Sequence, residues 1–113
     1  MDCLFCKFAK GEIPVNISHQ DDNIIAFDDI HPQAPIHKLI VPRKHLATAN
    51  DLMEEDNELI GSMFQMAKRI AKEQGIADGG YRLVMNCNAG AGQSVYHIHL
   101  HLLGGRQFNW PAG

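Results

Sequence analysis

Three histidines in strict alternation are the residues of this sequence best suited to chemistry. His97, His99 and His101 are separated by aliphatic residues and follow a glycine-rich turn. A β-strand places alternate side chains on one face, so the imidazoles are expected on a common face about 6.6–6.8 Å apart. Neutral imidazole can attack phosphorus and can act as a general acid or base near physiological pH. The alternation therefore predicts a site that binds and attacks a phosphate.

The loop before the histidines carries groups that a bound phosphate needs. Gly90 and Gly92 let the backbone approach a ligand closely. Gln93 and Ser94 add donors for the non-bridging oxygens, whose charge grows in the transition state. The sequence has no lysine-bearing phosphate loop and no acidic cluster typical of magnesium sites. The pattern favours metal-free transfer at a phosphate that already carries a good leaving group.

Cys3 and Cys6 form a C-x-x-C pair in a short helix predicted over residues 3–10. Three interpretations are open: a thioredoxin-like redox pair, two buried cysteines without a chemical role, and half of a tetrahedral zinc site. The alternating histidines could also bind catalytic zinc together, but on a flat strand the outer two lie about 13 Å apart. A division of roles is more plausible. His97 would complete a zinc site with both cysteines and His45, while the other two triad histidines stay free for phosphate.

Length and composition indicate a single domain, residues 1–113, that is an ordinary globular protein. Hydrophobic residues make up 45% and charged residues 20%, and the net charge is −3. That charge disfavours duplex nucleic acid as a partner. No apolar run is long enough for a transmembrane helix, and no signal peptide is visible. With an odd count of three cysteines, a reducing, cytoplasmic setting is expected.

The remaining pattern predicts an α+β domain. A long helix is expected from Asn50 or Asp51 to about Gln74, with a buried stripe that includes Phe64. The last two strands are expected to pair antiparallel. The predicted strands cover residues 15–19, 23–29, 37–42, 81–86 and 95–103.

The run from His97 to Leu103 resembles the signature of the histidine triad family, His-φ-His-φ-His-φ-φ, where φ is an apolar residue. Other segments resemble the branch called histidine triad nucleotide-binding proteins: Asp29-Ile30, Pro32 to Pro35, His37, Gly92 to Tyr96, Gly104 to Gln107 and Trp110-Pro111. The resemblance implies an α+β fold with a five-stranded antiparallel sheet, one long and one short helix. It also implies a homodimer that joins two sheets.

The same resemblance implies a purine nucleoside phosphoramidase that cleaves the P–N bond of adenosine or guanosine 5′-phosphoramidates. His99 would form a nucleotidyl-histidine intermediate. His101 would contact the phosphate and assist the leaving group, and His37 would support the protonation state of the nucleophile. The implied zinc ligands, found in a subset of the family, are Cys3, Cys6, His45 and His97.

The implied substrate contacts for AMP, GMP and their phosphoramidates cover the whole nucleotide. They are Asp29 for the ribose, Asn86, Gly92, Gln93 and Ser94 for the phosphate, and Leu4, Phe5, Phe27 and Ile30 for the base. Trp110 in the aromatic tail is a further candidate contact; it is expected to meet another surface, such as a second subunit, or to fold back on its own core.

Two alternative functions use the same histidines. One is hydrolysis of dinucleoside polyphosphates, which differs only on the leaving-group side of the pocket. The other is a nucleotide-binding regulatory protein whose catalysis is incidental, which predicts little turnover.

Overall fold

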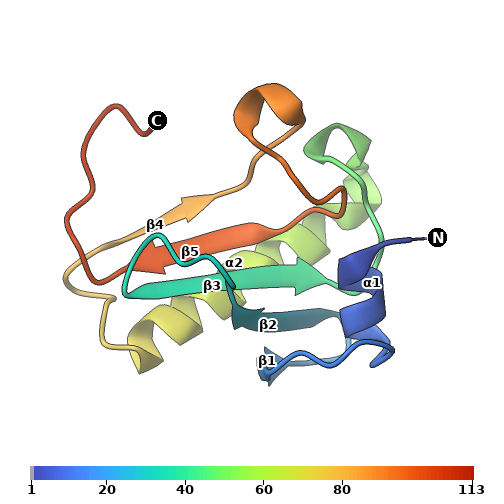
Figure 1. Cartoon of the computed structure of the whole chain (residues 1–113), viewed down its shortest axis with the longest axis horizontal. Helices are drawn as coiled ribbons and strands as arrows, with labels where there is room; N and C mark the ends of the chain where they lie inside the picture. The colour runs from blue at the N-terminus through green and yellow to red at the C-terminus, as the bar shows by residue number, and fades with distance from the viewer. Residues whose placement is uncertain (1) are drawn as a thin grey trace.

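The computed structural model describes residues 2–113, which build a five-stranded antiparallel sheet with one helix against each face (Figure 1). The helices are α1 (Leu4–Ala9) and α2 (Asn57–Glu73). The strands are β1 (Ile17–Gln20), β2 (Ile24–Asp28), β3 (Ile36–Pro42), β4 (Tyr81–Val84) and β5 (Leu100–Gly104). The predicted five-stranded antiparallel α+β architecture is confirmed.

The strand order is β1-β2-β3-β5-β4, so the strand that carries His101 lies inside the sheet. The predicted antiparallel pairing of the last two strands is confirmed, with Val84 opposite His101. On its other side β5 pairs with β3, and Leu39 lies opposite His101. Because paired residues in a sheet point to the same face, Leu39 marks the face on which the site is built.

The two faces of the sheet serve different purposes. One face packs against α2 through the buried side chains of Ile24, Ile40 and Leu102. The opposite face carries Phe27 and Val41 and is covered at one end by α1. Strand alternation therefore separates a packing face from a face that is free to hold the site.

The long helix begins later than predicted. Two 3-10 turns, Ala49–Asp51 and Glu54–Asp56, precede α2, which starts at Asn57 instead of near residue 50. Side-chain hydrogen bonds close the first of these turns and separate it from α2. The Thr48 backbone amide donates to the Asp51 carboxylate at 3.0 Å, and the Thr48 hydroxyl caps the same turn. The buried stripe of α2 is also narrower than expected, since Phe64 is 45% exposed.

The histidine strand is shorter than predicted, and this changes how the triad is held. Only His101 lies within β5, while His97 and His99 precede it in an irregular segment. The Ile98 amide donates to the Leu46 carbonyl at 2.8 Å, a bond outside the sheet ladder. The aliphatic alternation still holds, because Ile98 and Leu100 are both buried.

None of the helices in residues 2–113 is long and apolar enough to span a membrane.

Candidate active site and metal cluster

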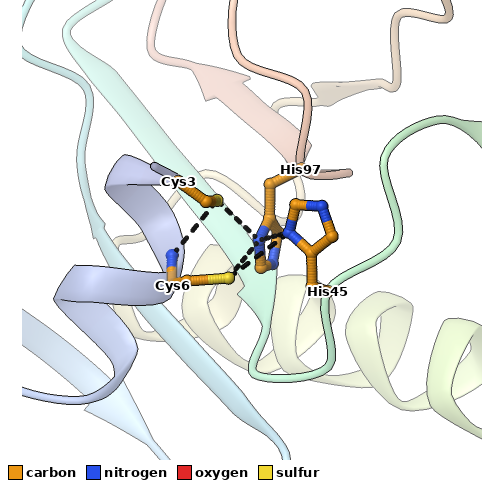
Figure 2. Close-up of side chains that lie close together, drawn as sticks. All are labelled: Cys3, Cys6, His45 and His97. Atoms are coloured by element: carbon orange, nitrogen blue, oxygen red, sulfur yellow. Dashed lines mark hydrogen bonds between the residues drawn. The ribbon is translucent and has the colours of Figure 1, made fainter. Parts of the chain in front are cut away.

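Two cysteines of the N-terminal segment and two histidines from distant segments meet in one cluster (Figure 2). Cys3 is the N-cap of α1, and Cys6 lies in its first turn. His45 follows β3, and His97 precedes β5. The four ligand atoms all lie within 4.8 Å of one another. The structure thus brings together the four residues that the sequence proposes as zinc ligands.

The spacing of the four ligand atoms fits a tetrahedral ion. A zinc ion with Zn–N bonds of about 2.0–2.1 Å and Zn–S bonds of about 2.3 Å holds its ligand atoms roughly 3.3–3.8 Å apart. Four measured separations lie near that range: Cys3 Sγ to His97 Nδ1 3.2 Å, Cys6 Sγ to His45 Nδ1 3.3 Å, Cys6 Sγ to His97 Nδ1 3.5 Å, and His45 Nδ1 to His97 Nδ1 3.2 Å. The residues present therefore fit zinc after a small outward movement.

The protonation of His97 also suits a metal ligand. Its side chain is fully buried, and its Nε2 lies 2.7 Å from the carbonyl oxygen of Pro42. A carbonyl oxygen can only accept, so Nε2 carries the proton and Nδ1 keeps a lone pair that faces the cysteines. Ligand histidines are commonly oriented by such a backbone carbonyl.

A cavity of about 420 Å³ opens on the same face of the sheet, which is a size suited to a small ligand. Its wall combines apolar side chains with three histidines and two carboxylates. The lining residues are Leu4, Phe5, Phe8, Pro14, Val15, Phe27, Asp28, Asp29, Ile30, His31, Leu39, Asn86, Gly92, Ser94, Val95, His99 and His101.

His99 lines this cavity and keeps one ring nitrogen with a free lone pair. Its Nδ1 lies 2.8 Å from the carbonyl oxygen of His97, so Nδ1 donates and Nε2 retains the lone pair. Phe5 meets the His99 ring edge-on, with centroids 5.1 Å apart and an interplanar angle of 89°. Both contacts restrict the imidazole, so its free nitrogen is held before any substrate binds.

His37 contacts His101, not the proposed nucleophile. His37 Nε2 lies 2.9 Å from His101 Nδ1, and Asp29 Oδ2 lies 3.4 Å from His37 Nε2. Burial lowers the pKa of His37. Burial, followed by the neighbouring His99 and His37, lowers the pKa of His101 to about 4. Both rings are therefore neutral at physiological pH, and any support His37 gives to His99 passes through His101.

The glycine-rich loop contributes Gly92 and Ser94 to the cavity, but Gln93 has a different role from the one predicted. The side-chain oxygen of Gln93 accepts from the backbone N–H of Asn88 at 2.7 Å. Its side-chain nitrogen donates to the backbone carbonyls of Ala47 and Val95 at 2.8 and 3.1 Å. These bonds use its polar atoms inside the protein, and its side chain is buried. Gln93 therefore holds the loop in shape, and the predicted phosphate contact is not supported by this geometry.

The predicted base-binding residues do line the cavity. Leu4, Phe5 and Phe27 provide apolar surface, and Ile30 stands at the rim with 85% of its surface exposed. Asp29 is also in the wall, where its Oδ1 accepts the His31 amide at 2.8 Å. An apolar wall next to a carboxylate suits a base and its attached sugar.

Trp110 lies elsewhere. It is 85% exposed and is not among the residues that line the cavity, so it neither contacts this pocket nor packs on the core of its own chain. The tail is held at the edge strand, where Arg82 donates to the Asn109 carbonyl at 2.9 Å. The expected substrate contact by Trp110 is not formed within this chain.

Several lining residues were missed by sequence reasoning. Phe8, Val15 and Val95 give no local signal, because their place depends on how α1 and the loops pack. Leu39 could have been found from strand pairing, since it lies opposite His101. His31 comes two residues after the proposed ribose-binding carboxylate of Asp29, and the sequence indicated it only as part of a loop.

Comparison with known proteins agrees with this arrangement. A family model described as "Scavenger mRNA decapping enzyme C-term binding" matches residues 2–109. The purine nucleoside phosphoramidase of Escherichia coli (strain K12) is 50% identical over 105 residues, covering 93% of this chain and 88% of that protein.

Solved structures show the same fold. The HIT family hydrolase from Legionella pneumophila Philadelphia 1 has a TM-score of 0.97 and 57% identity, covering 99% of this chain and 100% of that chain. The histidine triad nucleotide-binding protein from Candida albicans has a TM-score of 0.82 and 30% identity, covering 99% of this chain and 85% of that chain.

The sheet, the histidine run and the cavity together define a histidine triad domain. The chain belongs to the histidine triad (HIT) family, as the extent of these matches shows.

Proposed function

We propose that this protein is a purine nucleoside phosphoramidase that hydrolyses adenosine or guanosine 5′-phosphoramidates. One observation carries the proposal: His99 lines a cavity of about 420 Å³, and a 2.8 Å hydrogen bond from its Nδ1 leaves Nε2 with a free lone pair. The 50% identity to the phosphoramidase of Escherichia coli (strain K12) supports the same substrate class.

The proposed reaction has two steps at phosphorus. His99 Nε2 attacks, an N–P bond forms, and the electron pair of the substrate P–N bond goes to the leaving nitrogen, which takes up a proton and departs as the amine. Water then attacks the nucleotidyl-histidine, gives up a proton and releases the nucleotide. One water is consumed per turnover, and the chain acts by nucleophilic catalysis and orientation.

Substrate contacts follow from the position of each group around the cavity. The base would occupy the apolar slot formed by Leu4, Phe5 and Phe27. The ribose hydroxyls would donate to Asp29. Gly92 and Ser94 would face the phosphate, where amide and hydroxyl donors stabilise the growing charge on its oxygens.

Zinc is proposed as a structural ion held by Cys3, Cys6, His45 and His97. A closed set of four protein ligands leaves no open position for substrate, so the ion would stabilise the fold and take no part in the reaction. The close approach of the four ligand atoms, all within 4.8 Å of one another, supports this assignment. Metal analysis of protein purified without chelator should give about one zinc per chain, and a metal-free, fully stable protein would refute the site.

We further propose a homodimer and a cytoplasmic location. β4 lies at the edge of the sheet, and an unpaired edge is a natural surface for joining a second sheet. The unpaired cysteines suit a reducing compartment. Light scattering at micromolar concentration should give twice the chain mass, and cell fractionation should recover the protein with cytoplasmic markers.

A steady-state comparison tests the proposed activity directly. Adenosine 5′-phosphoramidate and a diadenosine polyphosphate would be compared at equal concentration, with guanosine 5′-phosphoramidate as a third substrate. A higher kcat/KM for the phosphoramidates supports the proposal. A higher value for the diadenosine compound would assign a dinucleoside polyphosphate hydrolase, and negligible turnover of all three would favour a nucleotide-binding regulator.

A further inference from the structure

We propose that the backbone amide of Gln33 sets the direction of the hydrogen bond between His37 and His101, so that His101 meets its ligand as a hydrogen-bond donor. Gln33 is then a positioning residue, since it acts through His37 and does not touch the substrate. The catalytic consequence rests on the proposed phosphoramidase function. The proton arrangement itself is a property of the protein without substrate.

The first step is the contact between Gln33 and His37. The Gln33 N–H lies 3.0 Å from His37 Nδ1. A backbone N–H can only donate, so Nδ1 must offer its lone pair. The His37 side chain is 3% exposed, and burial disfavours its charged form. Neutral His37 therefore carries its single proton on Nε2.

The second step passes this orientation to His101. His37 Nε2 lies 2.9 Å from His101 Nδ1, so the proton on His37 Nε2 is donated to the lone pair of His101 Nδ1. Asp29 is the carboxylate beside both rings, with its Oδ2 3.4 Å from His37 Nε2 and 3.9 Å from His101 Nδ1. Neutral His101 must then carry its proton on Nε2, the nitrogen left for a ligand in the cavity.

The loop that supplies the amide is itself held from the C-terminal segment. Arg106 Nε donates to the Gln33 carbonyl at 2.9 Å. Gly105, with φ +91°, sits against Pro35 so closely that an added Cβ would come within 3.0 Å of the proline ring. The first contact holds the loop at the Gln33 carbonyl and the second holds it at Pro35, so Arg106 is expected to act in the same direction as the amide with a smaller effect.

The chemical consequence concerns what His101 can recognise. A nitrogen that carries a proton binds an acceptor, such as a phosphoryl oxygen, and cannot accept from a donor. Protonation of His101 on both nitrogens would place two N–H groups face to face across the 2.9 Å contact with His37. Because the Gln33 N–H donates to His37 Nδ1, His37 cannot relieve this repulsion by moving its proton from Nε2 to Nδ1.

Nitrogen NMR of ¹⁵N-histidine-labelled protein without substrate tests the arrangement. In the wild-type protein at neutral pH, Nδ1 of both His37 and His101 should show lone-pair shifts and Nε2 of both should be protonated. A coupling through the hydrogen bond between Gln33 N and His37 Nδ1 is also expected. Protonated Nδ1 on either ring, or the absence of this coupling, would overturn the proposal whether or not any variant folds.

Substitutions at Gln33 and Arg106 then test whether the Gln33 amide causes this proton arrangement. Gln33→Pro removes the amide hydrogen, and Gln33→Ala is the matched control because it keeps that hydrogen and loses only the side chain. A hydrogen bond of typical strength biases such an equilibrium about fivefold, so Gln33→Pro should reveal a mixture of His37 tautomers and lower kcat about fivefold with little change in KM. Gln33→Ala should keep the wild-type tautomers of His37 and His101, and Arg106→Ala should shift the same signals less.

A folded Gln33→Pro protein with the wild-type tautomers would disprove the role of the amide. Wild-type tautomers as predicted, together with no phosphoramidase activity, would instead contradict only the proposed function. The two failures are therefore separate, because the NMR measurement uses no substrate.

Discussion

Two histidine clusters on the same face of the sheet have similar geometry and different chemistry. Cys3, Cys6, His45 and His97 form one, and Asp29, His37 and His101 form the other; in each, the ligand atoms lie within 4.8 Å of one another. Distance alone would make both clusters metal sites. In the first, the lone pair of His97 Nδ1 faces the two cysteine sulfurs. In the second, a proton already occupies the space between the two imidazoles.

The difference arises from the backbone group that is hydrogen-bonded to one histidine of each cluster, at the ring nitrogen that points away from the other cluster members. His97 Nε2 donates to the Pro42 carbonyl, which leaves Nδ1 free to bind a cation. His37 Nδ1 accepts the Gln33 amide, which places a proton on the nitrogen that faces His101. A backbone acceptor behind an imidazole prepares it for a metal, and a backbone donor behind it prepares it for hydrogen bonding.

His99 lies between the two clusters, and its removal should have the largest effect on activity. His99→Ala removes the nucleophile and should lower turnover of adenosine 5′-phosphoramidate at least about 10³-fold, while AMP binding remains measurable by calorimetry. His45→Ala is the comparison variant, because it removes a proposed zinc ligand from outside the cavity. Retained turnover in His99→Ala would assign the chemistry to another residue.

The metal cluster should determine stability. Cys6→Ser removes one ligand of the proposed zinc site and should lower the melting temperature by about 10 °C, which corresponds to a loss of about 2–4 kcal/mol. Cys87→Ser changes a cysteine outside the cluster and should leave melting unchanged. The melting temperatures would be measured by calorimetry with and without chelator. Equal values for Cys6→Ser, Cys87→Ser and wild type would contradict a structural role for the cluster.

The second cluster should respond to pH. The pKa of His101 falls from 6.5 to about 4 on folding, so between these values the unfolded chain binds a proton that the folded chain does not. This difference makes the free energy of unfolding fall as pH decreases from about 6.5 to about 4. His101→Gln removes that contribution and should show a shallower loss of stability in urea titrations at pH 7 and pH 4.5. Parallel losses in variant and wild type would contradict the depressed pKa.

Phe5 touches the first cluster and His99, and its substitution should give the smallest effect. Its ring meets His97 at 6.0 Å and His99 at 5.1 Å, in both cases edge-on. Phe5→Leu should cost about 1 kcal/mol of stability and should raise KM and lower kcat together by a few-fold. Phe8→Leu is the control, since Phe8 contacts Phe5 and Phe27 among the aromatic rings. Identical kinetics for the two variants would exclude a special role for Phe5.

Much of the fold could be predicted because it depends on local pattern. The apolar alternation around β5 and the stripe of α2 identified the elements that form the core. The start of α2 was wrong because Thr48 and Asp51 close a separate turn through side-chain bonds that periodicity does not reveal. The length of β5 was wrong because the Ile98 amide bonds to Leu46 instead of to a neighbouring strand.

The candidate site was predictable where residue type alone limits the chemistry. The C-x-x-C pair and the alternating histidines indicated the cluster of Cys3, Cys6, His45 and His97 and the place of His99 in the cavity wall. The part played by Gln93 was not predictable, because a side-chain amide can bond to a phosphate or to its own loop, and the packing decides which. The proton arrangement of His37 depends on one backbone amide, and the sequence gives no sign of where that amide points.

The contact between Cys3 and His97 also has a consequence for the order of folding. It joins residues 94 positions apart, so helix α1, which is only six residues long, must wait for nearly the entire chain before it can dock. Contacts of such long separation form slowly, and a helix this short is unstable alone. The cavity wall that α1 supplies should therefore be among the last parts to form during refolding. With the proposed zinc ion bound by Cys3 and Cys6, the rate of this step should depend on the concentration of zinc.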